Sequence, residues 1–272
     1  MLEQPGLRGL PLTGTREAFE RSWPAISSVK GWFAREEAEL LYAAAGEVPP
    51  GRWIVEVGSA YGRSTSALAL GKSPAVRILA IDPFAKPPNG AGEAALREFS
   101  ANIDRLGLSR EVALFRGTSE QAAHHSALLF EAIAGSQPES GETDLSRRPV
   151  GLLFIDGRHD RNSVLLDIDC WEPLVADGGR VIFHDAFFRL GTTLAILQRH
   201  LANSWFRYEG SVCNASMFRR ESSVANRELI ADSVRLSGRL GHLARNCAIT
   251  VGVRSGSKRL QRVFPPSADY EY

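Results

Sequence analysis

Residues 53–65 read Trp-Ile-Val-Glu-Val-Gly-Ser-Ala-Tyr-Gly-Arg-Ser-Thr, an apolar run followed by a glycine-bearing turn. The run predicts a buried strand over Trp53–Val57, and the turn leads into a helix that Ser64 can cap. Gly58 and Gly62 have no Cβ, so they allow the backbone to approach a ligand closely. This strand–turn–helix unit is the expected start of an α/β domain.

The spacing of the two glycines indicates which class of ligand the turn can bind. It is G-x-x-x-G, whereas the turn that receives the pyrophosphate of a nicotinamide dinucleotide is G-x-G-x-x-G. Glu56, two residues before the first glycine, fits a phosphate poorly and suits a cationic group such as an amine. The turn therefore favours a ligand other than a dinucleotide.

Strand-like and helix-like stretches alternate around this unit, which predicts a parallel sheet covered by helices on both faces. Further strands are expected at Val76–Ile81, Glu111–Phe115, Val150–Ile155 and Arg180–Phe183, and a hairpin at Trp205–Val212 and Ala215–Arg219. Helices are expected at Arg35–Ala45, Ser64–Leu70, Glu93–Leu106, Ser119–Ile133 and Ser163–Val175, the last with Asn162 as N-cap. The fold class is thus α/β: a Rossmann-like, doubly wound, mostly parallel sheet of seven strands with a C-terminal antiparallel hairpin.

Composition excludes several classes of protein. The chain has 272 residues, 44% of them hydrophobic, which is enough for one large core and excludes a disordered or fibrous chain. A net charge of +1 gives no global attraction to nucleic acid, so none is expected as a partner. Cys170, Cys213 and Cys247 are far apart in sequence, and we find no signal-peptide core and no membrane-span-length apolar run. We expect a cytoplasmic protein.

Four parts of the chain differ in character. Residues 1–30 are expected to cover the site as a lid or to lie against the core, and 31–220 to form the main domain. Residues 135–149 read as a surface insertion, and 221–272 as a basic amphipathic extension. Within the extension, residues 233–265 contain seven Lys or Arg and no Asp or Glu. That segment suits a peripheral contact with an anionic inner membrane, a helix that closes a homo-oligomer, or a poorly ordered tail.

Polar side chains follow three of the predicted strands. Asp82 ends the second strand, Asp156 and His159 follow the fourth, and His184-Asp185 follow the fifth. The carboxyl ends of parallel strands face one crevice, so these groups are expected to converge there. Asp156, His184 and Asp185 are compatible with Mg²⁺, Mn²⁺ or Ca²⁺, and ordinary strand-end capping is the alternative. Asp167 and Asp169 are expected on the exposed face of their helix.

The ordered set E-V-G-S-A-Y-G-R-S-T, A-I-D-P-F, F-I-D-G-R-H-D and G-G-R-V-I-F-H-D resembles class I S-adenosylmethionine-dependent methyltransferases. More narrowly, it resembles the branch with bacterial sugar and natural-product O-methyltransferases and catechol-type O-methyltransferases. The resemblance covers about residues 30–220.

The resemblance implies a set of cofactor-binding residues. Those implied to hold the methionine part of S-adenosylmethionine are Glu56, Gly58, Ser59, Tyr61, Gly62 and Ser64. It implies that Asp82 binds the ribose, that Ser119 or Thr118 flanks the adenine, and that Asp156 also borders the cofactor.

The resemblance also implies the reacting groups. His159 stands where catechol-type relatives carry the basic residue that accepts a proton. Asp156, His184 and Asp185 stand where metal-dependent relatives bind their ion, with an imidazole in place of one carboxylate.

The function expected is S-adenosylmethionine-dependent O-methylation of a small hydroxylated acceptor, such as a sugar or a glycosylated natural product, with a divalent metal. Two alternatives stay open from the sequence. One is an NAD(P)-dependent Rossmann enzyme, against which the glycine spacing argues. The other is a non-catalytic member of the fold that binds the cofactor or acts as a scaffold.

Overall fold

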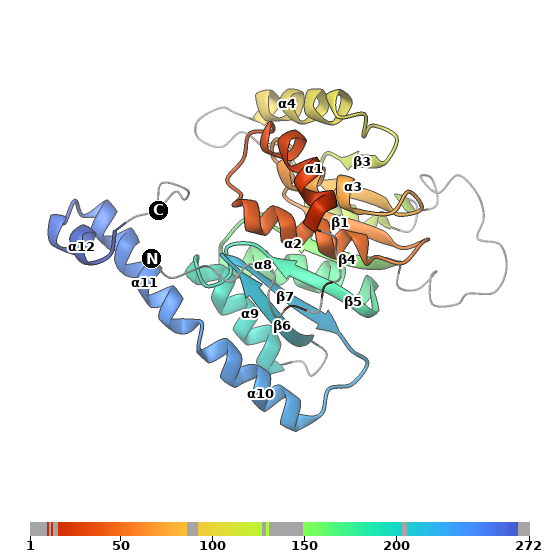
Figure 1. Ribbon diagram of the computed structural model, residues 1–272. Helices are drawn as coiled ribbons and strands as arrows, with labels where there is room; N and C mark the ends of the chain where they lie inside the picture. Colours follow the sequence, from red (N-terminus) through yellow and green to blue (C-terminus); the bar gives the residue numbers. More distant parts are fainter. Residues whose placement is uncertain are drawn as a thin grey trace.

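A computed structural model describes residues 10, 12, 16–85, 92–126, 129–130, 149–202 and 206–265 (Figure 1). Its centre is a seven-stranded sheet in the order β3-β2-β1-β4-β5-β7-β6. The strands are β1 Trp53–Val57, β2 Arg77–Ile81, β3 Val112–Phe115, β4 Val150–Ile155, β5 Val175–Phe183, β6 Phe206–Val212 and β7 Ala215–Arg220. β1 to β5 are parallel, whereas β7 pairs antiparallel with β5 and with β6. The predicted fold class is confirmed.

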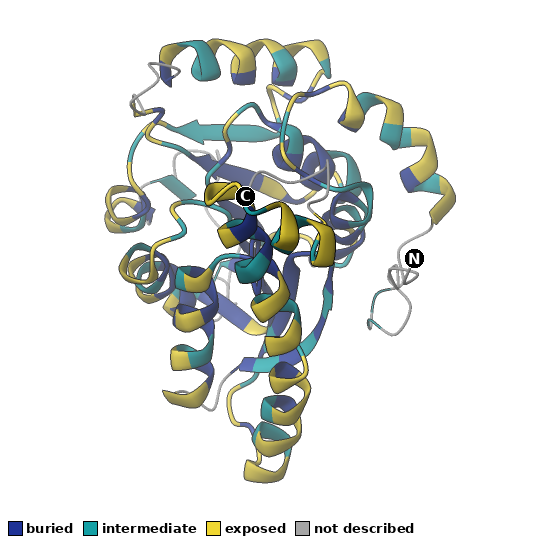
Figure 2. Ribbon diagram, turned by 90° about the vertical axis from the view of Figure 1, so that its left-hand side faces the viewer, coloured by how far each residue is buried: buried dark blue, intermediate teal, exposed yellow. Residues whose placement is uncertain are grey.

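Helices cover both faces of the sheet (Figure 1). On one face lie α1 Arg16–Ser27, α2 Arg35–Gly46, α3 Arg63–Gly71 and α4 Gly92–Arg105; on the other lie α5 Ser119–His124, α8 Arg161–Trp171, α9 Leu190–Ala202 and α10 Asn226–Ser237. Neighbouring residues of one strand serve opposite cores: Ile54 packs in the first and Val55 in the second. Figure 2 shows the consequence, a buried sheet between helices whose outer faces are exposed. This two-sided burial explains why the strands are continuous apolar runs.

The boundaries of one predicted helix are wrong at both ends. The side chain of Asp160, rather than Asn162, caps α8, because its Oδ1 accepts a hydrogen bond of 3.0 Å from the backbone N–H of Ser163. The helix ends at Trp171, since Pro173 forces a 3₁₀ turn over Glu172–Leu174, and β5 then starts at Val175. β5 is therefore longer than predicted.

Other predicted segments lie partly outside the described residues. These are Trp205, much of the insertion 135–149, and most of the predicted helix 119–133 beyond its first turns.

Helices near both ends of the described chain contact the core. α1 buries Phe19 and Ile26 in the first core. α10 is tied to the sheet by Asp232, whose Oδ2 accepts a hydrogen bond of 3.1 Å from the backbone N–H of Tyr208 in β6. α11 Leu240–Arg254 follows, and Asn246 Nδ2 donates to the carbonyl oxygen of Phe187 at 3.2 Å, in the loop after β5. The chain closes its described part with α12 Lys258–Val263.

Over the described ranges, no helix combines the length and apolar character of a membrane-crossing helix.

Candidate active site

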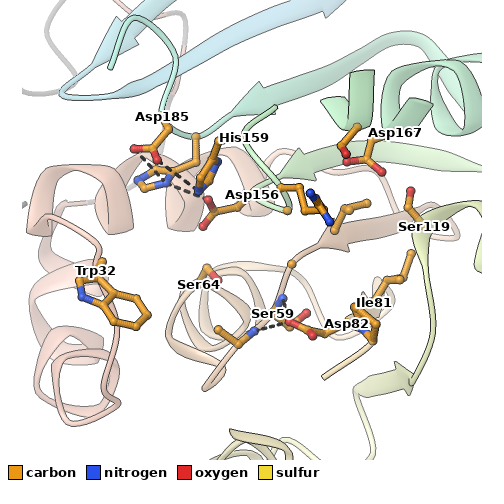
Figure 3. Close-up of a pocket in the computed structure, with 18 of the residues that line it drawn as sticks. Trp32, Ser59, Ser64, Ile81, Asp82, Ser119, Asp156, His159, Asp167 and Asp185 are labelled. Atoms are coloured by element: carbon orange, nitrogen blue, oxygen red, sulfur yellow. Dashed lines mark hydrogen bonds and ion pairs between the residues drawn. The ribbon is translucent and has the colours of Figure 1, made fainter. Parts of the chain in front are cut away.

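A cavity of about 640 Å³ opens at the carboxyl edge of the parallel strands (Figure 3). It is lined by the residues that follow β1, β2, β4 and β5, by the N-terminus of α5, and by the segment 30–33 between α1 and α2. The predicted convergence of the strand ends is therefore present. Of the predicted site residues, Glu56 and Gly62 do not line the cavity, whereas the other members of the set do.

The packing around the first turn disfavours a Cβ at either of its two glycines. Gly58 has φ +91°, and a Cβ there would lie 2.2 Å from the carbonyl oxygen of Asp156. Gly62 has φ +88°, and its Cβ would lie 3.1 Å from the ring of Phe99. Both positive φ values also disfavour other residues. Gly58 thus lets the end of β1 sit directly against the end of β4.

Glu56 lies behind the turn, fully buried. The hydroxyls of Ser59, Ser64 and Thr65 surround its carboxylate, and Thr65 Oγ1 donates to Oε2. Burial outweighs these hydrogen bonds and raises the pKa of Glu56 to about 7. Its position makes Glu56 a support for the turn, with Ser59 and Ser64 between it and the cavity.

Asp82 shapes the turn from the next strand. Its Oδ2 accepts hydrogen bonds from the backbone N–H groups of Ser59 at 3.1 Å and Ala60 at 2.9 Å, and its Oδ1 accepts one from Phe84 at 2.7 Å. Figure 3 shows the carboxylate between the two strand ends, beside the cavity. The carboxylate can still receive a ribose hydroxyl, because Oδ1 keeps one lone pair, whereas both lone pairs of Oδ2 accept from the turn.

Asp167 is a site residue that the sequence analysis placed on an exposed face. It is 7% exposed, lines the cavity next to Ser119, and has its pKa raised by burial to about 6. The signal was available, because Asp167 follows Val164 by three residues and precedes Trp171 by four, on the buried stripe of α8. Asp169 is exposed as predicted and pairs with Arg199.

His159 and Asp185 form a pair at the other end of the cavity. His159 Nε2 lies 3.4 Å from Asp185 Oδ2, and the histidine side chain is 39% exposed. Asp185 has φ +56°, a conformation that Asp and Asn tolerate better than most residues. Arg189 Nε also lies 3.4 Å from this carboxylate. An imidazole held by a carboxylate can accept a proton at its second nitrogen.

His184 is buried between carboxylates. Its Nδ1 lies 2.9 Å from Asp156 Oδ1, and its Nε2 lies 3.4 Å from Glu37 Oε2. Burial acts to lower the pKa of His184, but the charges of Asp156 and Glu37 outweigh it and hold the pKa well above its ordinary value. Glu37 was missed by the sequence analysis, since in sequence it is one of several acids at the start of an ordinary helix.

The predicted metal set is not supported by this arrangement. Both ring nitrogens of His184 face carboxylate oxygens, so neither has a lone pair directed at an ion that Asp156 and Asp185 would share. In the described part of the chain, no three His, Cys, Asp or Glu side chains have the arrangement of a metal site. His184 is thus not placed as a metal ligand.

Aromatic and basic side chains border the cavity on the side of segment 30–33. Trp32 is 51% exposed, and its ring centroid lies 6.1 Å from that of Tyr61. Lys30 Nζ lies 4.4 Å from the centroid of Tyr61. Figure 3 shows Trp32 across the cavity from Asp167 and Ser119, so the cavity has two chemically distinct ends.

Residues 55–186 match the family model of a methyltransferase domain. No curated protein matches the chain.

Solved structures share the fold at low identity. A methyltransferase from Geobacter sulfurreducens is 17% identical with a TM-score of 0.51, over 78% of this chain and 92% of that one. An O-methyltransferase from Bacillus cereus in complex with SAH is 16% identical with a TM-score of 0.50, over 77% and 94%. The matched segment 55–186 runs from β1 to just beyond His184-Asp185 and so contains the strand ends that line the cavity. The family predicted from the motifs is confirmed for this segment: residues 55–186 match a methyltransferase domain, within a fold that the chain shares with solved methyltransferases.

Proposed function

We propose that the chain methylates a hydroxyl oxygen of a small acceptor, such as a sugar or a glycosylated natural product. The observation that carries this proposal is that the His159–Asp185 pair and the Asp82-bound turn border one cavity. The same cavity therefore has the cofactor-binding residues at one end and the proton-accepting pair at the other. S-adenosylmethionine, when bound, supplies an electrophilic methyl group.

The residues at one end of the cavity fit the cofactor. Asp82 Oδ1 has a lone pair left to accept a hydrogen bond from a ribose hydroxyl, and Ser119 stands where the adenine would end. Asp167 adds a buried carboxylate beside Ser119 that can accept a hydrogen bond from an amino group. Ser59, Tyr61 and Ser64 are the members of the turn that line the cavity and would contact the methionine part.

At the other end, His159 removes the acceptor's proton. The carboxylate of Asp185, 3.4 Å from Nε2, favours the tautomer with its proton on that nitrogen, which keeps the lone pair on Nδ1 for the acceptor hydroxyl. An alcohol is a weak acid, so the proton must leave as the oxygen gains its methyl group rather than before. The proton then resides on His159, and Asp185 stabilises the resulting imidazolium.

The exposed ring of Trp32 supports a ring-shaped acceptor. An indole face beside the ring of Tyr61 offers an apolar surface on which a sugar or planar ring can stack. This surface leaves the acceptor's hydroxyls free to face His159. Neither this wall nor the small net charge recommends a nucleic acid as acceptor.

Calorimetry with S-adenosylmethionine, S-adenosylhomocysteine and NAD tests the cofactor. We expect binding of the first two and none of NAD; binding of NAD alone would instead indicate a dehydrogenase-type enzyme. Release of S-adenosylhomocysteine is then followed with a panel of hydroxylated sugars, glycosides and phenols. Binding of S-adenosylmethionine without turnover of any acceptor in the panel would indicate a non-catalytic member of the fold.

A further inference from the structure

Four ionisable side chains from three distant parts of the chain meet beside the acceptor end of the cavity. Around the ring of His184 lie Asp156 at 2.9 Å, Glu37 at 3.4 Å and Asp185, whose Oδ1 is 3.8 Å from Nδ1. His184 is 6% exposed, and the side chain of Glu37 is fully buried. We call these four residues the His184 cluster; in Figure 3 its members Asp156 and Asp185 lie at the same end of the cavity as His159.

The hydrogen-bond geometry fixes the charge of this cluster. A neutral imidazole donates through one nitrogen only, whereas His184 meets a carboxylate oxygen at each nitrogen. A neutral ring would turn the lone pair of one nitrogen toward a carboxylate oxygen, which is repulsive at this buried position. The imidazolium form satisfies both carboxylates, and the ring of Phe33 stacks against it with centroids 4.9 Å apart.

Glu37 is not free to turn away toward another cation. Its Oε1 accepts a hydrogen bond from the backbone N–H of Asn214 at 2.9 Å, and its Oε2 accepts one from Ala34 at 2.9 Å. These bonds join α2 to the turn between β6 and β7. The carboxylate is thus held with one oxygen toward His184.

We propose that the imidazolium of His184 occupies the place and supplies the charge of a divalent ion, so that this methyltransferase works without bound metal. The proposal rests on the proposed function for its catalytic meaning. His184 is a positioning residue: its nitrogens contact Asp156 and Glu37 rather than the acceptor. Its positive charge offsets the carboxylates of Asp156 and Asp185, which would otherwise repel an acceptor oxygen as that oxygen loses its proton.

Removal of the imidazole gives the sharpest test. In His184→Ala, the carboxylates of Glu37, Asp156 and Asp185 border the vacated space, and three carboxylates are a ligand set suited to Mn²⁺. Mn²⁺ binding is measured by electron paramagnetic resonance of the free ion, with S-adenosylhomocysteine present. We expect about one Mn²⁺ per chain for His184→Ala and no binding to the wild type. His200→Ala is the matched control, because it removes another buried imidazole that lacks this ring of carboxylates; it is expected to bind no Mn²⁺.

A second measurement requires no variant. In ¹⁵N NMR of the wild-type imidazoles at neutral pH, His184 should show both nitrogens protonated, and its signals should not change with EDTA or Mn²⁺. Binding of one Mn²⁺ to the wild type, a neutral His184, or failure of a folded His184→Ala to gain Mn²⁺ would overturn the proposal. None of these readouts uses methyl transfer, so the proposal can fail while the proposed function stands, and the reverse.

Discussion

The two ends of the cavity are built in different ways. At the cofactor end, Asp82 binds backbone N–H groups only 22 and 23 positions earlier in the chain, within one strand–helix–strand unit. At the acceptor end, Glu37 is bonded to groups 147 and 177 positions away. The turn and Asp82 at the cofactor end are thus a local structure, whereas the acceptor end exists only when α2, β4, β5 and the β6–β7 turn have come together. Changes at the acceptor end should therefore alter catalysis without altering cofactor affinity.

His159→Ala is expected to give the largest difference between the effect on methyl transfer and the effect on cofactor affinity. Loss of the proton acceptor should lower the methyl-transfer step by about 10²–10⁴-fold, the usual effect of losing a general base, with unchanged affinity for S-adenosylhomocysteine. Single-turnover methyl transfer to an acceptor found in the panel measures it. His125→Ala, an exposed histidine, is the control and should keep full activity. Equal losses of transfer and of cofactor affinity in His159→Ala would show that the two ends are not separable.

The cofactor end carries a pH-dependent stability that Glu56→Gln should remove. The pKa of Glu56 is raised to about 7, so the folded state binds this proton more tightly than the unfolded state, and wild-type stability falls as pH rises from 4.5 to 7. The difference in unfolding free energy between wild type and variant should change over this range by about 3 kcal/mol at most. Urea unfolding at a series of pH values measures it, with the exposed Glu93→Gln as control. If the unfolding free energies of wild type and Glu56→Gln varied with pH in parallel, the raised pKa of Glu56 would be contradicted.

Asp82→Ala should weaken the cofactor end alone. The variant loses the acceptor for a ribose hydroxyl and the hydrogen bonds that shape the turn, so affinity for S-adenosylhomocysteine should fall about 10- to 100-fold. Calorimetry measures the change. Asp160→Ala, which removes a helix cap on the same edge of the sheet, should leave that affinity intact. Unchanged affinity in Asp82→Ala would remove this residue from the cofactor site.

A smaller effect is expected from Asn246→Ala at the acceptor end. Its amide supports the loop that follows β5 through Phe187, so the variant should lose about 1 kcal/mol of stability and raise the acceptor KM, with cofactor affinity unchanged. Thermal unfolding and steady-state kinetics test both. The matched control is Gln261→Ala, whose amide also donates to a backbone carbonyl but within α11 and α12. A KM that shifts equally in both variants would show that Asn246 has no specific effect on the loop.

The smallest effect concerns the C-terminal helices. If residues 233–265 contact an anionic membrane surface, sedimentation with anionic vesicles should recover the protein in a salt-sensitive manner, because their seven positive charges are screened by salt. Neutral vesicles are the control, and equal recovery with both would exclude this contact. Vesicle binding should not change affinity for S-adenosylhomocysteine, since the cofactor end lies in other elements.

The same contrast explains what could be predicted from the sequence. Asp82, Asp156, His159 and Asp185 were found because each follows an apolar strand, and parallel strands bring their carboxyl ends together. Glu37 was not found, because its burial depends on the packing of α2 against the distant β6–β7 turn. Without Glu37, His184 reads as a free ligand, so the sequence suggested a metal site.

For the glycines of the first turn, the sequence predicts the residue type but not its packing partner. Their need was predicted, but the sequence does not reveal that the atoms nearest to Gly58 belong to Asp156, about a hundred positions later in the chain.

The left-handed backbone at Asp185 restricts which amino acids natural variation or directed evolution can place there. Its φ of +56° leaves Gly, Asn and Asp as the well-tolerated residues, and of these only Asp retains the carboxylate that meets His159. Two independent filters, one conformational and one chemical, therefore select the same residue. In a mutant library intended to broaden the range of acceptors, most variants at position 185 are therefore expected to be inactive. Diversity is better placed at Trp32 and Phe188, which line the cavity from conventional backbone conformations.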